Sequence, residues 1–227
     1  ATYNTAVGYA AGAVINTGIQ NTLIGGLAGD AITTGDNNVA FGYASLGANT
    51  TGSNNTSVGV SSSDALTTGS YNTAVGQAAL GADTLGSRAV AIGPSALGRQ
   101  NFTSATNNYN IGIGYDAGLN VTTGTQNTLI GGLAGDALTS SVGNVAVGYL
   151  SLSAATTADL NTAIGHRALT TNILSDRNVA LGYAALSTHN LASNGDGYNV
   201  GIGYNAGGAI TTGVQNTLIG GLAGDAT

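Results

Sequence analysis

The sequence NTLIGGLAGDA occurs three times without a change, at residues 21–31, 127–137 and 216–226. Each copy belongs to a longer pattern, in which an Asn is followed by three residues that are mostly apolar or Thr, and then by Gly. Thirteen copies of this pattern run through the 227 residues, and the sixth copy has Ala89 in place of the Asn. Repetition on this scale is typical of a repeat architecture rather than of a protein built around one catalytic site.

The copies follow one another at a nearly constant interval. Ten of the twelve steps have a period of 17, as from Asn4 to Asn21, whereas the two steps that begin at Ala89 and Asn178 are each longer by four positions. We interpret residues 1–227 as a single repeat array in three blocks, which are 4–109, 110–198 and 199–227. Neither end carries a distinct capping segment, so we expect either a segment of a longer fibre or a subunit that stacks end to end.

The residues between the Asn and the Gly predict a short β-strand. The residue after Asn is Thr, Val or Ile in every copy, the third residue is always large and apolar, and the one between them is mostly Ala, Gly, Ser or Leu. This alternation and the β-branched residues favour a strand, whereas the recurring Gly disfavours a helix. A unit of this length is also too short for a helical hairpin. We therefore predict an all-β parallel β-solenoid of about thirteen coils, each with two short strands and two turns.

In such a solenoid, equivalent residues of successive coils stack in ladders, because each strand pairs with the same strand of the next coil. We expect two structural ladders. The Asn ladder consists of Asn4, Asn21, Asn38, Asn55, Asn72, Asn110, Asn127, Asn144, Asn161, Asn178, Asn199 and Asn216. The Gly ladder consists of Gly8, Gly25, Gly42, Gly59, Gly76, Gly93, Gly114, Gly131, Gly148, Gly165, Gly182, Gly203 and Gly220.

The apolar residues of the strands predict self-association. Each coil has only two or three large apolar side chains, which would make a thin core, and small residues such as Ala40 and Ala146 give the strand a second close-packing face. A strand that is apolar on both faces is normally covered on both. We therefore expect a homotrimer, in which copies of the chain cover each other around a three-fold axis.

The scarcity of charged residues restricts the possible functions. The chain has ten Asp, four Arg, no Lys, no Glu and no Cys, with a net charge of -6. Four scattered Arg cannot build the basic surface that nucleic acids require, so we expect no nucleic-acid partner. No apolar run reaches about 18 residues, so we expect no membrane insertion in this segment. With His166 and His189 as the only His, we expect neither an enzyme nor a cofactor, and His166 falls in a column held mostly by Tyr, which predicts a surface ladder.

Several segments resemble known fibre repeats. These are NTAVGYAAG (4–12), RAVAIGPSALG (88–98), NVAVGYLSL (144–152) and NTAIGHRAL (161–169). They resemble the head repeats of YadA-like trimeric autotransporter adhesins, although the coil here is a few residues longer. This resemblance implies a left-handed parallel β-roll, a homotrimer and an extracellular place in a cell-surface filament or adhesin. The segments are also similar to the NTAIGYxAL…TTG arrays of phage and viral tail fibres, which implies a virion fibre shaft as the alternative.

Binding residues should lie where the copying fails, and it fails most in the two long coils that begin at Ala89 and Asn178. The four extra residues of each should bulge from the coil, and loops that project from a rigid scaffold often carry recognition residues. For a host-surface receptor or glycan bound from the side, the candidate contacts are Arg99, Phe102, His189, Leu191 and Asp196.

A ligand-binding solenoid is a further alternative. Asp30, Asp136 and Asp225 each follow Gly-Leu-Ala-Gly and are candidates for Ca²⁺, although the nine-residue Ca²⁺ repeat of other β-rolls is absent and the Asp stand mostly alone in their columns. Turns such as Thr33–Thr34–Gly35 form Thr columns that ice could match, but adjacent Thr face opposite ways. The expected function is therefore a non-enzymatic structural fibre segment that gives length, stiffness and adhesion.

Overall fold

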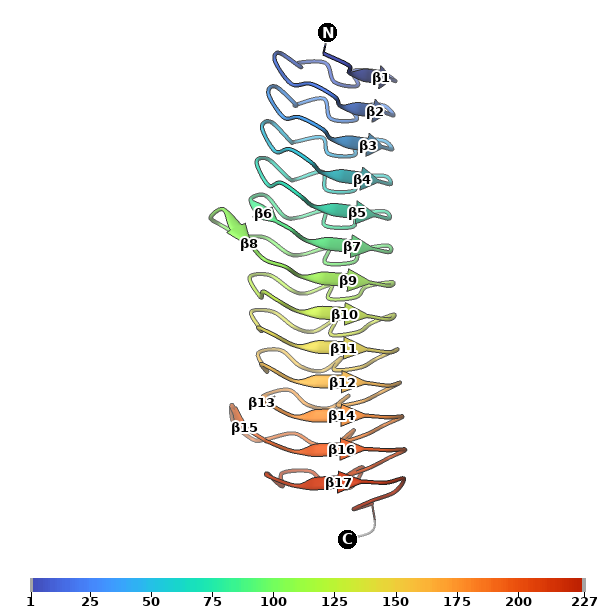
Figure 1. Cartoon of the computed structure of the whole chain (residues 1–227), viewed down its shortest axis with the longest axis vertical. Helices are drawn as coiled ribbons and strands as arrows, with labels where there is room; N and C mark the ends of the chain where they lie inside the picture. The colour runs from blue at the N-terminus through green and yellow to red at the C-terminus, as the bar shows by residue number, and fades with distance from the viewer. Residues whose placement is uncertain (1, 226–227) are drawn as a thin grey trace. The chain divides into compact units, whose positions relative to one another are not determined.

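The computed structural model describes residues 2–225, which form strands, turns and bends but no helix. The chain divides into two compact units, the first ending at Asn110 and the second beginning at Ile111. In each unit, successive coils lie one above another and their strands pair in parallel (Figure 1). The predicted all-β fold, a parallel β-solenoid of about thirteen coils, is therefore confirmed.

In the first unit, each coil contributes one three-residue strand to a parallel sheet. Neighbouring strands pair in register from one coil to the next, as Thr22 pairs with Val39 and Leu23 with Ala40. The strands are β1 (Thr5–Val7), β2 (Thr22–Ile24), β3 (Val39–Phe41), β4 (Thr56–Val58), β5 (Thr73–Val75) and β7 (Val90–Ile92).

The second unit repeats this arrangement. Its strands are β9 (Ile111–Ile113), β10 (Thr128–Ile130), β11 (Val145–Val147), β12 (Thr162–Ile164), β14 (Val179–Leu181), β16 (Val200–Ile202) and β17 (Thr217–Ile219). The register survives the long coil, because Val179 of β14 pairs with Val200, the equivalent residue of β16. The four extra residues therefore do not shift the sheet.

The second strand that the sequence predicts in every coil forms only beside the long coils. There, β6 (Gly86–Ser87) pairs with β8 (Thr106–Asn107), and β13 (Ser175–Asp176) pairs with β15 (Gly195–Asp196). β8 and β15 project from the other coils in Figure 1. Elsewhere in residues 2–225, a single bridge forms outside the strands. In the regular coils the prediction is wrong because successive N–H groups converge on one acceptor, as those of Thr33 and Thr34 do on the Thr50 carbonyl, instead of alternating as in a strand.

The core holds the middle residue of each strand, which is small in most coils, and not the large residues on either side of it. Ala40 in the middle of β3 is fully buried, whereas Val39 and Phe41 on either side are 38% and 53% exposed. The core is completed by turn residues such as Leu46, which is also fully buried. The expectation that the large strand residues form the core is wrong, because the narrow coil accommodates Ala and a turn Leu instead.

The repeated stretch NTLIGGLAGDA is a second way to fill this interior. Six coils have Ala in the strand and Leu later in the turn, as in the pair Ala146 and Leu152. In NTLIGGLAGDA the sizes are exchanged, so that Leu129 is followed by Gly135, where a Cβ would lie 2.7 Å from the Leu129 side chain. The exchange keeps the interior close-packed, as folded proteins require.

Candidate functional site

The Asn ladder lies in the interior and serves the structure. Asn161 is fully buried, its Nδ2 donates to the Ser175 carbonyl at 2.9 Å, and its Oδ1 accepts the backbone N–H of Asn178 at 2.9 Å. Equivalent bonds join Asn127 to Asn144 and Asn144 to Asn161. Because buried polar groups require partners, a shift of one coil against the next would leave a whole column of amides unpaired.

The Gly ladder is a steric requirement. Its members have φ between 127° and 137°, a region that residues with a side chain rarely adopt. A Cβ on Gly131 would also lie 2.6 Å from the carbonyl oxygen of Gly148 in the next coil. These Gly therefore allow the backbones of successive coils to approach each other.

The first long coil replaces the amide that Ala89 lacks. Asn108 Oδ1 accepts the backbone N–H of Asn110 at 2.9 Å, and Gln100 Oε1 accepts Asn110 Nδ2 at 2.8 Å. The insertion thus supplies the acceptor that an Asn at position 89 would have provided. The sequence could have indicated this replacement, since the only break in the Asn ladder coincides with a longer coil.

The large strand residues form an exposed apolar face on the outside of each sheet. In the second unit, this strand face includes Val179 and Leu181 of β14, which are exposed, and Ile164 of β12, which is half-buried. Thr and Val stack on the same face at the position after the Asn, as Thr162 pairs with Val179. A contiguous apolar patch on a protein surface usually marks an interaction site.

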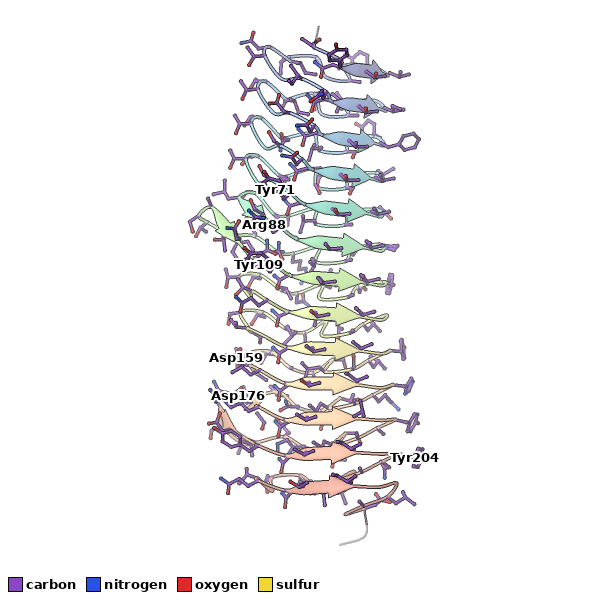
Figure 2. All side chains as sticks on the ribbon, in the orientation of Figure 1. Tyr71, Arg88, Tyr109, Asp159, Asp176 and Tyr204 are labelled. Atoms are coloured by element: carbon purple, nitrogen blue, oxygen red, sulfur yellow. The ribbon has the colours of Figure 1, made fainter. Side chains whose placement is uncertain are left out.

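A row of aromatic rings lines the turn that follows the strands of the second unit. Tyr149, His166, Tyr183 and Tyr204 stack with successive centroid distances of 5.5, 5.2 and 5.3 Å. The prediction that His166 belongs to a surface ladder is confirmed. In the first unit, a different column holds the Arg88 guanidinium between the rings of Tyr71 and Tyr109, at 5.0 and 6.0 Å from their centroids (Figure 2).

The five candidate contact residues of the long coils do not all face solvent. Phe102 and His189 are buried, and His189 Nε2 lies 2.9 Å from Ser175 Oγ. Burial lowers the pKa of the His189 imidazole. The expectation that these two side chains project is wrong, because they fill the space that each wider coil encloses. Arg99 and Asp196 are exposed and Leu191 is half-buried, so a contact role for them stays a prediction.

The three candidate Ca²⁺ ligands lie in equivalent turns, and one of them, Asp136, has Asp116 as an acidic neighbour. No group of three or more His, Cys, Asp or Glu that is able to hold a metal ion occurs in residues 2–225. Asp225 Oδ1 accepts Asn205 Nδ2 at 2.5 Å. Burial raises the pKa of Asp136, and the charge of Asp116 raises it further. Asp30 is half-buried in the same kind of turn.

One acidic column does exist, which corrects the expectation that the Asp stand mostly alone. Asp159, Asp176 and Asp196 stack on successive coils, and the Asp176 carboxylate accepts the backbone N–H of Asp159 at 2.8 Å. Burial raises the pKa of Asp176, and the charges of Asp159 and Asp196 raise it further. The sequence conceals the column because the regular period leads from Asp176 to Ser193, whereas the insertion brings Asp196 into that place. Arg177 forms an ion pair with Asp196.

The Thr columns are engaged within the solenoid. The hydroxyls of Thr33, Thr50 and Thr67 donate to carbonyls of the next coil at 3.0, 3.2 and 2.9 Å. These hydroxyls therefore stabilise the contact between coils.

Comparison with protein-family models, with curated proteins and with solved structures finds no match to this chain. Within residues 2–225, no helix is sufficiently long and apolar to cross a membrane.

Proposed function

We propose that the chain is a non-enzymatic structural segment of an extracellular fibre, in a cell-surface filament or adhesin, and that it acts as a homotrimer. The observation that carries the proposal is the outer strand face, whose large apolar residues recur from coil to coil and are exposed or half-buried in each unit. A sheet that is apolar on its outer side requires a cover, and a second and third copy of the same chain supply one.

The pairing within the chain restricts how copies can associate from the side. The backbone N–H groups of Gly165 and Gly182 already donate to Val147 and Ile164 in neighbouring coils, both at 2.8 Å. Internal coils thus have no free strand edge, so lateral contact has to use side chains. The strand face offers apolar side chains at a constant spacing, which suits a long and uniform interface.

The interior supports the same proposal, because it favours stiffness. Asn amides bond from coil to coil, and Gly backbones lie in direct contact. Separating two coils would break these bonds along with the strand pairing. Coils held together in this way maintain their spacing under load, which is what a fibre segment has to do.

Native mass spectrometry tests the trimer, with an expected mass of three times the 21.9-kDa chain. Ile164→Asp places a charge on the strand face and should give a monomer, whereas Ser193→Asp on an exposed loop should leave the mass unchanged. A monomeric wild-type chain at high concentration would contradict the proposal. Antibody labelling of intact cells or virions tests the location.

A further inference from the structure

The aromatic row and Arg167 form a surface that the fibre proposal does not use. Tyr149, Tyr183 and Tyr204 are 50%, 48% and 59% exposed, so each of these residues is accessible from solvent. His166 is exposed between them and stacks on Tyr183 with an interplanar angle of 1°. Four consecutive coils therefore offer rings at an almost constant spacing.

Arg167 is the charged group of this surface. It follows His166 in the chain and is exposed, and its guanidinium makes no hydrogen bond or ion pair within the described residues 2–225. Arg88 and Arg177, by contrast, are engaged with Asn107 and Asp196. A guanidinium presents a rigid pair of donors that matches a carboxylate.

The surrounding charge favours an anion at Arg167. Between residues 144 and 198 the acidic residues are Asp159, Asp176 and Asp196, and these form one column. Figure 2 shows Asp159 and Asp176 at the opposite edge of the coils from Tyr204. Beyond this range, Asp225 lies at the Tyr204 end of the row, where its Oδ1 accepts Asn205 Nδ2. Arg167 is therefore the positive group at the centre of the row, and no acidic residue of 144–198 outside the column lies beside it.

The backbone beside the row is already paired, which argues against a peptide ligand. The N–H groups of Arg167, Ala184 and Asn205 donate to the carbonyls of Tyr149, His166 and Tyr183 at 3.0, 2.9 and 2.8 Å. An extended peptide that binds by strand addition needs a free edge, and this surface has none. A saccharide needs no such edge, because its C–H groups pack on aromatic rings and its hydroxyls bond to side chains.

We propose that Tyr149, His166, Tyr183 and Tyr204 bind an extended acidic polysaccharide along the side of the second unit, with one of its carboxylates on Arg167. The ring spacing of 5.2 to 5.5 Å is comparable with the length of one sugar unit in an extended chain. Successive sugars would then meet successive rings. The preference for an acidic chain comes from Arg167, and the affinity for a saccharide comes from the rings.

Calorimetric titration of the full chain with an oligogalacturonate of defined length tests this proposal, with the neutral methyl ester of the same oligosaccharide as the second ligand. The wild type should bind the acidic form more tightly. Arg167→Gln should remove this preference, and Tyr183→Ala should weaken both ligands by about tenfold or more. Tyr43→Ala, which truncates an exposed Tyr of the same column between Gly26 and Val60, should leave binding unchanged.

Three results would overturn the proposal: no binding of the oligogalacturonate by the wild type, equal effects of Tyr43→Ala and Tyr183→Ala, or equal binding of poly-glutamate, which would indicate charge attraction without saccharide recognition. Circular dichroism and native mass are recorded for each variant, so that loss of the trimer is distinguished from loss of the ligand. Tyr204→Ala is measured as well, so that the test does not depend on one variant folding.

Discussion

Gln100 Nε2 donates to Asp83 Oδ2 at 2.6 Å, and both side chains are fully buried in the first unit. Asp83 Oδ1 also accepts the backbone N–H of Gly86 at 3.0 Å. Burial raises the pKa of Asp83 above its ordinary value, although these hydrogen bonds act in the opposite direction. The carboxylate therefore destabilises the folded state at neutral pH, relative to the same group in the unfolded chain.

This shift predicts that the chain becomes more stable as the pH falls from 7 towards 4. The folded state binds the proton of Asp83 before the unfolded state does, so stability is lost as the pH rises through the folded-state pKa. Asp64, Asp136 and Asp176 shift in the same direction, in each case mainly through burial. Asp83→Asn removes the titrating group and should reduce the dependence of the Tm on pH. Thermal melts between pH 4 and pH 8 measure both effects, and a Tm that falls steadily on acidification would contradict the prediction.

His189 has the opposite effect on the pH dependence of stability, and its contribution can be separated from that of the Asp residues by mutation. Burial lowers the pKa of its imidazole, so the folded state prefers the neutral ring, and the stability present above the ordinary pKa is lost as the pH falls through the folded-state value. Asn172 occupies the equivalent place one coil earlier and is also fully buried. His189→Asn should therefore make the gain in Tm on acidification larger than in the wild type. The same melts, recorded for both proteins, give this difference.

Two adjacent Gly should differ sharply in their tolerance of a side chain. Gly131 has φ 129°, and its Cβ would lie 2.6 Å from the Gly148 carbonyl oxygen, so Gly131→Ala should cost more than about 3 kcal/mol. At Gly132 the nearest atom would be a ring carbon of Tyr149 at 3.4 Å, where a small movement suffices. Gly132→Ala is the matched control and should cost less than about 1 kcal/mol. Urea unfolding measures both, and equal costs would show that the coils can separate freely at the Gly ladder.

Truncation of one ladder amide should destabilise the chain although it removes little apolar surface. Asn161→Ala leaves the buried N–H of Asn178 without its acceptor, whereas the Ser175 carbonyl keeps Asn172 Nδ2 as a second donor. An unpaired buried group costs about 1 to 3 kcal/mol, so a loss in this range is expected. Asn194→Ala, on an exposed part of the second long coil, should have almost no effect. Similar effects for the two variants in urea unfolding would contradict the role given to the ladder.

The architecture could be predicted from the repeat itself. Which face of each strand lies inside could not. A period of 17 with Asn and Gly at fixed places is enough to predict a parallel solenoid with in-register ladders, and the paired strands have that register. Alternation defines two faces of a strand but does not state which one is inside. The interior is set by turn residues such as Leu152, whose left-handed φ of 52° nothing in the sequence indicates.

The long coils illustrate the same limit for the candidate site. Their length predicts a bulge, and β8 and β15 do project from the coils (Figure 1). Phe102 and His189 nevertheless turn inward, because the wider coil has space that a buried side chain must fill. The aromatic row, in contrast, was visible as a column of Tyr, since a constant period aligns exposed residues as reliably as buried ones.

Because the large side chain can come from the strand or from the turn, we expect that three substitutions together restore the stability that one of them removes. Leu129→Ala alone removes a fully buried side chain beside Gly135 and should cost about 2 to 5 kcal/mol. Gly135→Leu restores the volume from the turn, and φ 56° at Gly135 is close to the 52° of Leu152. A Cβ on Gly135 would lie 2.8 Å from the Leu138 side chain, so Leu138→Ala has to accompany it.

The triple variant then copies the next coil, where Ala146, Leu152 and Ala155 are all fully buried. We expect its free energy of unfolding to lie within about 1.5 kcal/mol of the wild type, because volume-conserving exchanges are the best tolerated in a core. Leu129→Ala combined with Leu138→Ala, without the new Leu, is the control and should be the least stable of the series. A triple variant no more stable than that control would show that the two fillings are not interchangeable, and that NTLIGGLAGDA recurs for a reason other than the packing of its own coil.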